Sequence, residues 1–199
     1  MRSCGRAAGT RNNVTRRIPY DARYNEAVGT TEPYRGTPHT VARMVELVKG
    51  SRGEKSIRVR RHAEQIVGGL RAKDYSSEVV GINYWWAQHG RYTRDPVHVE
   101  MLRDPERLVD DALSGKLSLD CDEYATAIGC SCLCIGAEIE FVTVAFKPPR
   151  GGRPAPHSHV FVRSKDPRTG VWWVLDPVAG RKTTEMLSRV THYRIYKVQ

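Results

Sequence analysis

The stretch Leu119-Asp120-Cys121-Asp122-Glu123-Tyr124-Ala125 decides the fold. It places one cysteine between two aspartates, and the segment that follows, residues 124–135, is uncharged, small and apolar. Asp120 is a residue type that caps helices, and acidic residues favour the first helical turn. Helical spacing puts four apolar residues on one stripe: Ala125, Ile128, Cys132 and Ile135. We therefore predict a buried helix with Cys121 at its start.

A thiol at a helix start lies beside free backbone N–H groups and the positive end of the helix dipole. That location lowers the pKa of a cysteine from about 8.5 into a range of roughly 3.5–7.5. The carboxylates of Asp120 and Asp122 oppose this effect if they point at the sulfur. The alternative is that Cys121 is a small buried residue without chemistry, as most free cysteines are.

The cysteines and the apolar runs set the expected environment. The 199 residues include five cysteines and no Cys-x-x-Cys pair, which excludes a zinc ribbon and a thioredoxin motif. Residues 1–10 are basic but carry no apolar run, so they do not resemble a signal peptide. No apolar stretch approaches the length of a membrane span. We expect free thiols in a cytoplasmic protein that has no signal peptide and no membrane partner.

The positive charge is concentrated near the N-terminus. Residues 1–61 carry 14 Lys and Arg against 5 Asp and Glu, whereas residues 62–199 carry 18 against 17. We interpret residues 1–38 as a basic, flexible arm and residues 39–199 as the folded domain. The arm suits an acidic partner or nucleic acid by charge alone, and a merely solvated tail is the alternative. No nucleic-acid-binding motif accompanies it.

The remaining periodicity predicts helices first and strands last. Helical patterns begin near Thr37 and cover about 40–50, 54–72, 77–89 and 104–115, with Leu108, Val109 and Leu113 facing inward in the last. After the cysteine helix, alternation with a period of two predicts strands at 138–146, 159–163, 171–176 and 191–198. This order favours an α+β domain with an antiparallel sheet.

The turn at residues 166–170 pairs the second and third of these strands. Counting outward from its centre near Arg168 places His159 and Asp176 almost opposite each other, where a carboxylate can orient an imidazole. Cys121, His159 and Asp176 then supply a nucleophile, a base and an orienting group. The alternatives are a surface histidine and an aspartate that only starts a turn.

These residues resemble the transglutaminase-like superfamily, in particular its phage and prophage branch. The resemblance spans roughly residues 40–180 and departs from the family at Leu119, where a glycine is usual. Its motifs are Asp120-Cys121-Asp122-Glu123-Tyr124-Ala125 with 135–144, Ser158-His159-Val160-Phe161-Val162, Trp173-Val174-Leu175-Asp176-Pro177-Val178, and the upstream segments 91–96 and 104–108.

The resemblance implies a papain-like fold and a Cys121-His159-Asp176 triad that transfers acyl groups from protein or peptide amides through a thioester. Water as the acceptor would make the protein a cysteine protease or a deamidase, and an amine would make it a transamidase. The backbone N–H of Cys121 is one oxyanion donor. Tyr92 matches an aromatic residue upstream of the family's nucleophile and is the first candidate for the second donor, with Gln88 and Trp86 behind it.

No cofactor or metal is expected, because no calcium-loop signature is present. A zinc site made of Cys121, His157, His159 and Asp176 has suitable ligand types, but its spacing does not resemble a tetrahedral site. A protein of another class is the competing hypothesis: a phage-type virion or assembly protein that keeps the fold without turnover. Under that hypothesis the protein is expected in the virion as well as in the host cytoplasm.

Overall fold

The computed structural model describes residues 32–33, 36–95, 99–151 and 156–198. The prediction of a basic arm at residues 1–38 falls mostly outside this part of the chain, as does Cys4. The elements follow in this order: β1 (Glu32–Pro33), α1 (Thr37–Lys49), α2 (Ile57–Val67), α3 (Tyr75–His89), β2 (Arg91–Tyr92), β3 (Val99–Glu100), α4 (Pro105–Leu113), β4 (Ser118–Leu119), α5 (Cys121–Cys134), β5 (Glu138–Ala145), β6 (His159–Lys165), β7 (Trp172–Leu175), η1 (Gly180–Lys182), α6 (Thr183–Ser188) and β8 (His192–Lys197).

Side-chain caps set the starts of four helices. Ser56 begins α2, Asp74 begins α3, Asp104 begins α4 and Asp120 begins α5, and each side chain accepts a hydrogen bond from a backbone N–H three residues later. Such a bond satisfies one of the amide groups that a helix start leaves without an internal partner. The short polar residues of the sequence therefore fix where these helices begin.

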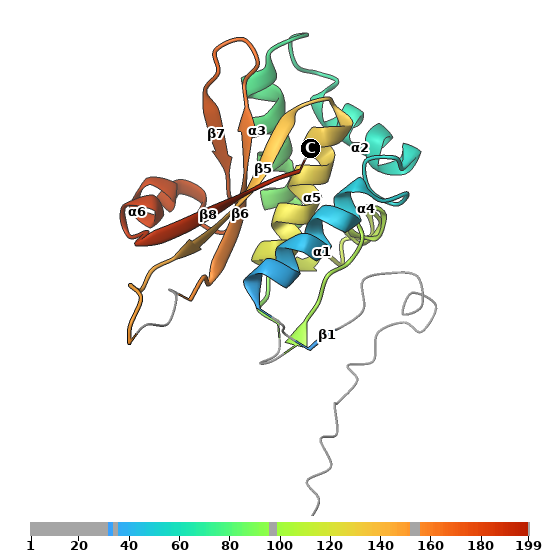
Figure 1. Cartoon of the computed structure of the whole chain (residues 1–199). Coiled ribbons are helices and arrows are strands. Elements are labelled where there is room, and N and C mark those ends of the chain that lie inside the picture. The colour runs from blue at the N-terminus through green and yellow to red at the C-terminus, as the bar shows by residue number, and fades with distance from the viewer. Residues whose placement is uncertain (1–31, 34–35, 96–98, 152–155, 199) are drawn as a thin grey trace, which may run out of the picture.

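Helix α5 is the centre of the molecule. It contacts α1, α2, α3 and α4 as well as β5 and β6, and 12 of its 14 residues are buried. Figure 1 shows it between the sheet and the other large helices. Gly129 allows this close approach, because a Cβ at that position would lie 2.9 Å from Ile139 Cδ1 and 3.2 Å from the Phe141 ring. The side chains of Ile139 and Phe141 therefore pack directly against the backbone of the helix at this position.

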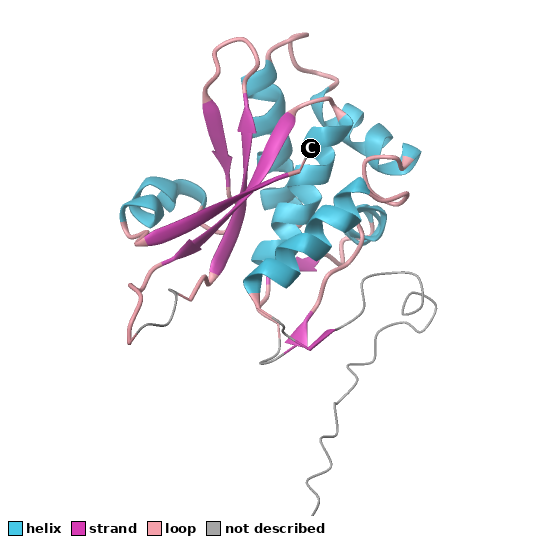
Figure 2. Ribbon diagram, viewed as in Figure 1, coloured by secondary structure: helices cyan, strands magenta, loops and turns pink. Residues whose placement is uncertain are grey.

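The sheet is antiparallel with the strand order β7-β6-β5-β8 (Figure 2). Val144 pairs with His159 across β5 and β6, and Val162 pairs with Leu175 across β6 and β7. One face, with Ile139, Phe141 and Val162, belongs to the main helical core. The sequence-based prediction of an α+β domain with an antiparallel sheet is confirmed.

The other face of the sheet has a small core of its own. Val142, Val144 and Phe161 are buried there, and Phe146, Val174, Met186 and Val190 pack against them. Helix α6 lies on this side of the sheet, opposite the large helices (Figure 1). The domain therefore has three layers, and the strand ends that carry His159 and Asp176 lie between the two outer layers.

Several details differ from the prediction. Helix α2 ends at Val67 rather than near Ala72, because Gly68 and Gly69 follow it and favour the helix less than other residues do. Leu113 is 61% exposed, so its predicted inward position is wrong. The sequence analysis also missed η1, α6 and the two-residue strands, whose periodicity is too short to detect. Within the described ranges, none of the helices combines the length and the apolar character that crossing a membrane would require.

His62 is a buried titratable residue of the helical layer. It is 5% exposed, and neither ring nitrogen has a hydrogen-bond partner among the described residues. The indole rings of Trp85 and Trp86 approach it edge-on, at 4.3 Å and 5.6 Å between ring centroids. Burial, aided by the nearby charges of His89 and Arg58, lowers the pKa of His62 to about 4.

This pKa makes the free energy of unfolding depend on pH. Between pH 6.5 and about 4 the unfolded chain binds a proton at His62 that the folded protein does not, so stability falls as the pH falls through this window. We expect His62→Phe, which keeps an aromatic ring against Trp85, to lose less stability than the wild type between pH 7.5 and pH 5 in urea titrations. An identical loss in both proteins would contradict this assignment.

Candidate active site

Cys121 is the first residue of α5, and its local structure follows from Asp120. The Asp120 Oδ1 atom accepts a hydrogen bond of 3.2 Å from the backbone N–H of Glu123 and so caps the helix. The Cys121 side chain is partly buried and lines a pocket with a volume of about 220 Å³. The predicted helix start and its cap are therefore present, and the thiol faces a cavity.

His159 and Asp176 form a hydrogen-bonded pair. His159 Nε2 lies 2.7 Å from Asp176 Oδ2, while Asp176 Oδ1 accepts bonds from the backbone N–H groups of Val178 (3.0 Å) and Ala179 (3.1 Å). Asp176 is 3% exposed, and the hydrogen bonds to both of its carboxylate oxygens fix the orientation of the side chain. Because Nε2 is engaged by Asp176, Nδ1 is the ring nitrogen left for a second partner.

The hairpin register differs by one residue from the predicted one. Val162 pairs with Leu175, so the same alternation sets Asp176 across from Phe161 rather than His159. Residues 159 and 161 share one face of the sheet because side chains alternate along a strand. His159 and Asp176 therefore meet as diagonal neighbours, and the long imidazole ring spans the offset.

Cys121 and His159 line the same pocket, together with Val160. The backbone N–H of Val160 hydrogen-bonds to the Cys121 sulfur, which ties the start of α5 to the start of β6. Helix α5 packs across β6, so the contact follows from the same packing that buries the helix. Cys121, His159 and Asp176, which are far apart in the sequence, thus come together at one end of the sheet.

The environment of the thiol is less favourable to a thiolate than the sequence analysis predicted. Burial is the main cause and the Asp120 carboxylate the second, and together they raise the pKa of Cys121 to about 12. Asp176 adds to this rise, whereas the Val160 N–H opposes it. The prediction of a lowered pKa from the helix dipole is therefore wrong for the resting protein, because desolvation and the capping carboxylate outweigh the dipole.

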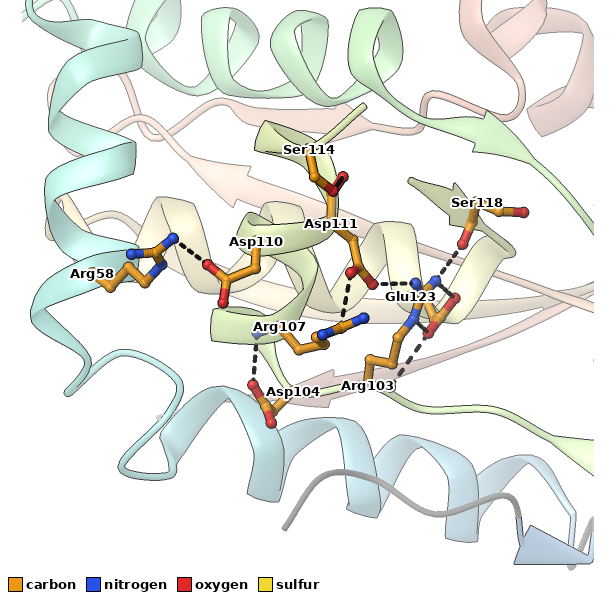
Figure 3. Close-up of polar contacts among 9 residues, drawn as sticks. All are labelled: Arg58, Arg103, Asp104, Arg107, Asp110, Asp111, Ser114, Ser118 and Glu123. Atoms are coloured by element: carbon orange, nitrogen blue, oxygen red, sulfur yellow. Dashed lines mark hydrogen bonds and ion pairs between the residues drawn. The ribbon is translucent and has the colours of Figure 1, made fainter. Parts of the chain in front are cut away.

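A buried ion-pair network holds the first turn of α5 (Figure 3). The Arg103 guanidinium binds Glu123 through two parallel bonds of 2.6 Å, from Nε to Oε1 and from Nη2 to Oε2. Its Nη1 donates to Asp111 Oδ2 at 2.8 Å, and Nη2 also donates to the carbonyl of Ser118. Glu123 lies two residues after Cys121, so this network fixes the start of α5 against α4 and β4.

Of the three residues that the sequence suggests as a second oxyanion donor, only Tyr92 lies near Cys121. Tyr92 lines a second pocket, of about 690 Å³, which His159 and Asp120 also line. Its hydroxyl is close enough to Cys121 for the charges of the two groups to interact. Gln88 is exposed on α3 and lines neither pocket. Trp86 is fully buried, and its indole N–H donates to Ser131 Oγ at 3.1 Å, far along α5 from the thiol. Trp86 is therefore a core residue, and its candidacy as an oxyanion donor is wrong.

His157, named above as a possible zinc ligand, is partly buried, and its Nδ1 lies 2.8 Å from Thr143 Oγ1. In the described part of the chain, no three His, Cys, Asp or Glu side chains are grouped so that they could hold a metal ion. The sequence analysis missed Arg103 and Arg94. Neither lies in a periodic pattern or beside a cysteine, so no local signal distinguishes these arginines from surface ones.

No family model matches the sequence, and no curated protein matches it. Among solved structures, the chain is similar to a candidate protease from Parabacteroides distasonis, with a TM-score of 0.53 and 15% identity over 72% of this chain and 27% of that one. It is also similar to a candidate cysteine protease from Cytophaga hutchinsonii, with a TM-score of 0.46 and 15% identity over 81% of this chain and 54% of that one. The chain thus spans about a quarter and about half of these proteins, and the first likeness shows a shared fold.

Loss of the buried guanidinium is expected to destabilise the whole domain. Arg103→Met leaves the Glu123 carboxylate buried without its partner, which costs roughly 3–5 kcal/mol of unfolding free energy for a buried pair. Arg43→Met is the control, since it removes an exposed pair with Glu46 and costs less than about 1 kcal/mol. Urea titration measures both, and equal small losses would show that the network does not hold α5.

The charge at Asp120 provides a test of the thiol's surroundings. Asp120→Asn keeps an oxygen to cap α5 and removes the negative charge, so the pKa of Cys121 falls and its alkylation by iodoacetamide at pH 7 becomes several-fold faster. Asp74→Asn makes the same change at the cap of α3 and should leave the rate unchanged. Mass spectrometry of the modified peptide gives the rate, and a slower reaction of the Asp120 variant would contradict the assignment.

Proposed function

We propose that this chain is a thiol-dependent acyl-transfer enzyme of the transglutaminase-like class, acting on protein or peptide amides. The observation that carries the proposal is the 2.7 Å pairing of His159 with Asp176, together with the pocket that His159 shares with Cys121 at the start of a buried helix. Cysteine nucleophiles are activated by this kind of arrangement on unrelated folds. The shared fold with a candidate protease is consistent with it.

The first step is attack of Cys121 Sγ on the carbonyl carbon of the amide. Because the pKa of the thiol is raised to about 12, the resting sulfur is protonated, and His159 Nδ1 takes the proton as the S–C bond forms. The imidazolium is stabilised by Asp176, whose own orientation two backbone N–H groups maintain. This route differs from one that starts from a resting thiolate–imidazolium pair.

Two donors suit the oxyanion that forms on the carbonyl. The backbone N–H of Cys121 lies at the start of α5, where no preceding helical carbonyl accepts it. The Tyr92 hydroxyl is the second donor. Strand β2 pairs with β4, which places Tyr92 opposite Leu119, two residues before Cys121. Burial raises the pKa of Tyr92, so its phenol keeps the proton that it donates.

Collapse of the intermediate breaks the C–N bond. His159 gives its proton to the leaving amine and a thioester remains on Cys121. A second acceptor, activated by the same imidazole, then attacks the thioester carbonyl and releases the thiol. With water the reaction is peptide cleavage or deamidation, and with a primary amine it is transamidation.

The triad is tested by turnover. We expect Cys121→Ala to abolish activity, and Asp176→Asn to lower kcat by about 10³–10⁴-fold because the imidazole loses its orienting charge. Fluorescent casein reports cleavage, released ammonia reports deamidation, and a fluorescent primary amine reports transamidation. Cys130→Ala, a change at a buried thiol of the same helix, is the matched control and should keep activity.

If none of these substrates reacts, thiol labelling shows whether the site is inactive or whether the right substrate has not been tried. Iodoacetamide should modify Cys121 before the buried cysteines, and His159→Ala should remove that preference. Equal, slow labelling of all cysteines in both proteins would reject the triad. It would favour the alternative, a virion or assembly protein that uses this fold without turnover.

A further inference from the structure

Two pockets of different size flank His159. The smaller, of about 220 Å³, contains Cys121 and His157, and the larger, of about 690 Å³, extends toward α6. Asp120, Ser158 and His159 line both. The two cavities are therefore the two halves of one cleft, and His159 lies where they meet.

The two halves differ in charge. Among the described residues that line the smaller pocket are the carboxylates of Asp120 and Asp122 and no lysine or arginine. The larger pocket is lined by Arg94, Lys182 and Arg189. The larger pocket also contains carboxylates, but it alone of the two offers lysine and arginine, so an anionic group in the cleft is placed more favourably there than in the smaller pocket.

The three cations reach the larger pocket from separate segments: Arg94 follows β2, Lys182 ends η1, and Arg189 follows α6. Within the described ranges, none of them forms an ion pair with a carboxylate, so their charges remain available to a ligand. The Arg94 guanidinium hydrogen-bonds to the Tyr92 hydroxyl, which places one of these charges next to the reacting centre.

The floor of the larger pocket is apolar. Phe146, Val178 and Met186 line it, and Phe146 and Met186 are held by the small core on the outer face of the sheet. The Arg189 guanidinium lies 5.9 Å from the centroid of the Phe146 ring, over this floor. A side chain with a short methylene stem and a terminal anion matches such a surface, because the stem covers apolar area while the anion meets the rim.

The pocket also contains three carboxylates, two of which already have partners. Asp95 accepts a hydrogen bond from the backbone N–H of Met101, and Asp120 caps α5. Glu185, in the first turn of α6, is the third. The three cations thus balance these three carboxylates in formal charge, whereas the smaller pocket has two carboxylates and no lysine or arginine.

We propose that the larger pocket is a substrate subsite that selects an acidic side chain, such as glutamate, close to the amide that Cys121 attacks. This inference rests on the proposed acyl-transfer function, because it assigns the substrate class of that same cleft. The anion lies against Arg94, Lys182 and Arg189, and its stem covers Phe146 and Met186.

Matched affinity reagents test the subsite without a known substrate. N-acylated dipeptide chloromethyl ketones alkylate a thiol with loss of chloride. They are made with Glu, Gln or Lys either one or two residues before the ketone. We expect the best Glu reagent to modify Cys121 about 5- to 10-fold faster than its Gln counterpart, with Lys slowest, and the preference to shrink at 0.5 M salt because exposed charges are screened.

Charge removal locates the preference. The double variant Lys182→Gln, Arg189→Gln should bring the Glu and Gln rates together, whereas Arg181→Gln, one residue away on η1 and outside the pocket lining, should keep them apart. All three positions of change are exposed, so circular dichroism should show unchanged folding.

The outcomes separate this inference from the proposed function. Modification of Cys121 that depends on His159 but proceeds equally with Glu, Gln and Lys reagents would overturn the acidic subsite and leave the triad in place. Modification no faster than that of free glutathione, and unchanged by His159→Ala, would overturn the triad itself. Equal loss of preference in the Arg181 variant would assign the effect to overall charge instead of the pocket.

Discussion

The bidentate bond between Arg103 and Glu123 is the constraint on which the site depends. It lies in the interior, where a charge without a partner is costly, so the first turn of α5 has one favourable position. The same guanidinium reaches Asp111 and the carbonyl of Ser118, and β4 in turn pairs with the strand that carries Tyr92. One arginine thus sets the relative positions of Cys121, the proposed nucleophile, and Tyr92, the proposed oxyanion donor.

The carboxylates of Asp120 and Glu123 at the start of α5 have different roles. Glu123 turns inward to Arg103, whereas Asp120 caps the helix and faces the cleft. The cap stabilises the helix start but also raises the pKa of Cys121, which burial has already raised. Helix stability and thiolate formation therefore oppose each other at Asp120, and proton transfer to His159 during attack resolves that conflict in the proposed mechanism.

The layer on the outer face of the sheet connects packing with the candidate site. Helix α6 and the segment after β7 cover Val142, Val144 and Phe161, and the same segment supplies the backbone N–H groups that orient Asp176. It also supplies two of the cations beside the larger pocket. Packing, the geometry of the His159–Asp176 pair and the proposed specificity are consequently coupled in residues 176–190.

The sequence alone determined the elements whose signals are local: the caps, the long helices, the four main strands, and the hairpin that brings His159 near Asp176. These follow from the hydrophobic period and from residue types at helix starts and turns, which act over a few residues. Only the tertiary structure decided the diagonal pairing of His159 with Asp176, the core position of Trp86, the raised pKa of Cys121 and the contacts of Arg103. Each of these depends on burial and on charges brought together from distant segments, and the local pattern of a sequence carries no record of such neighbours.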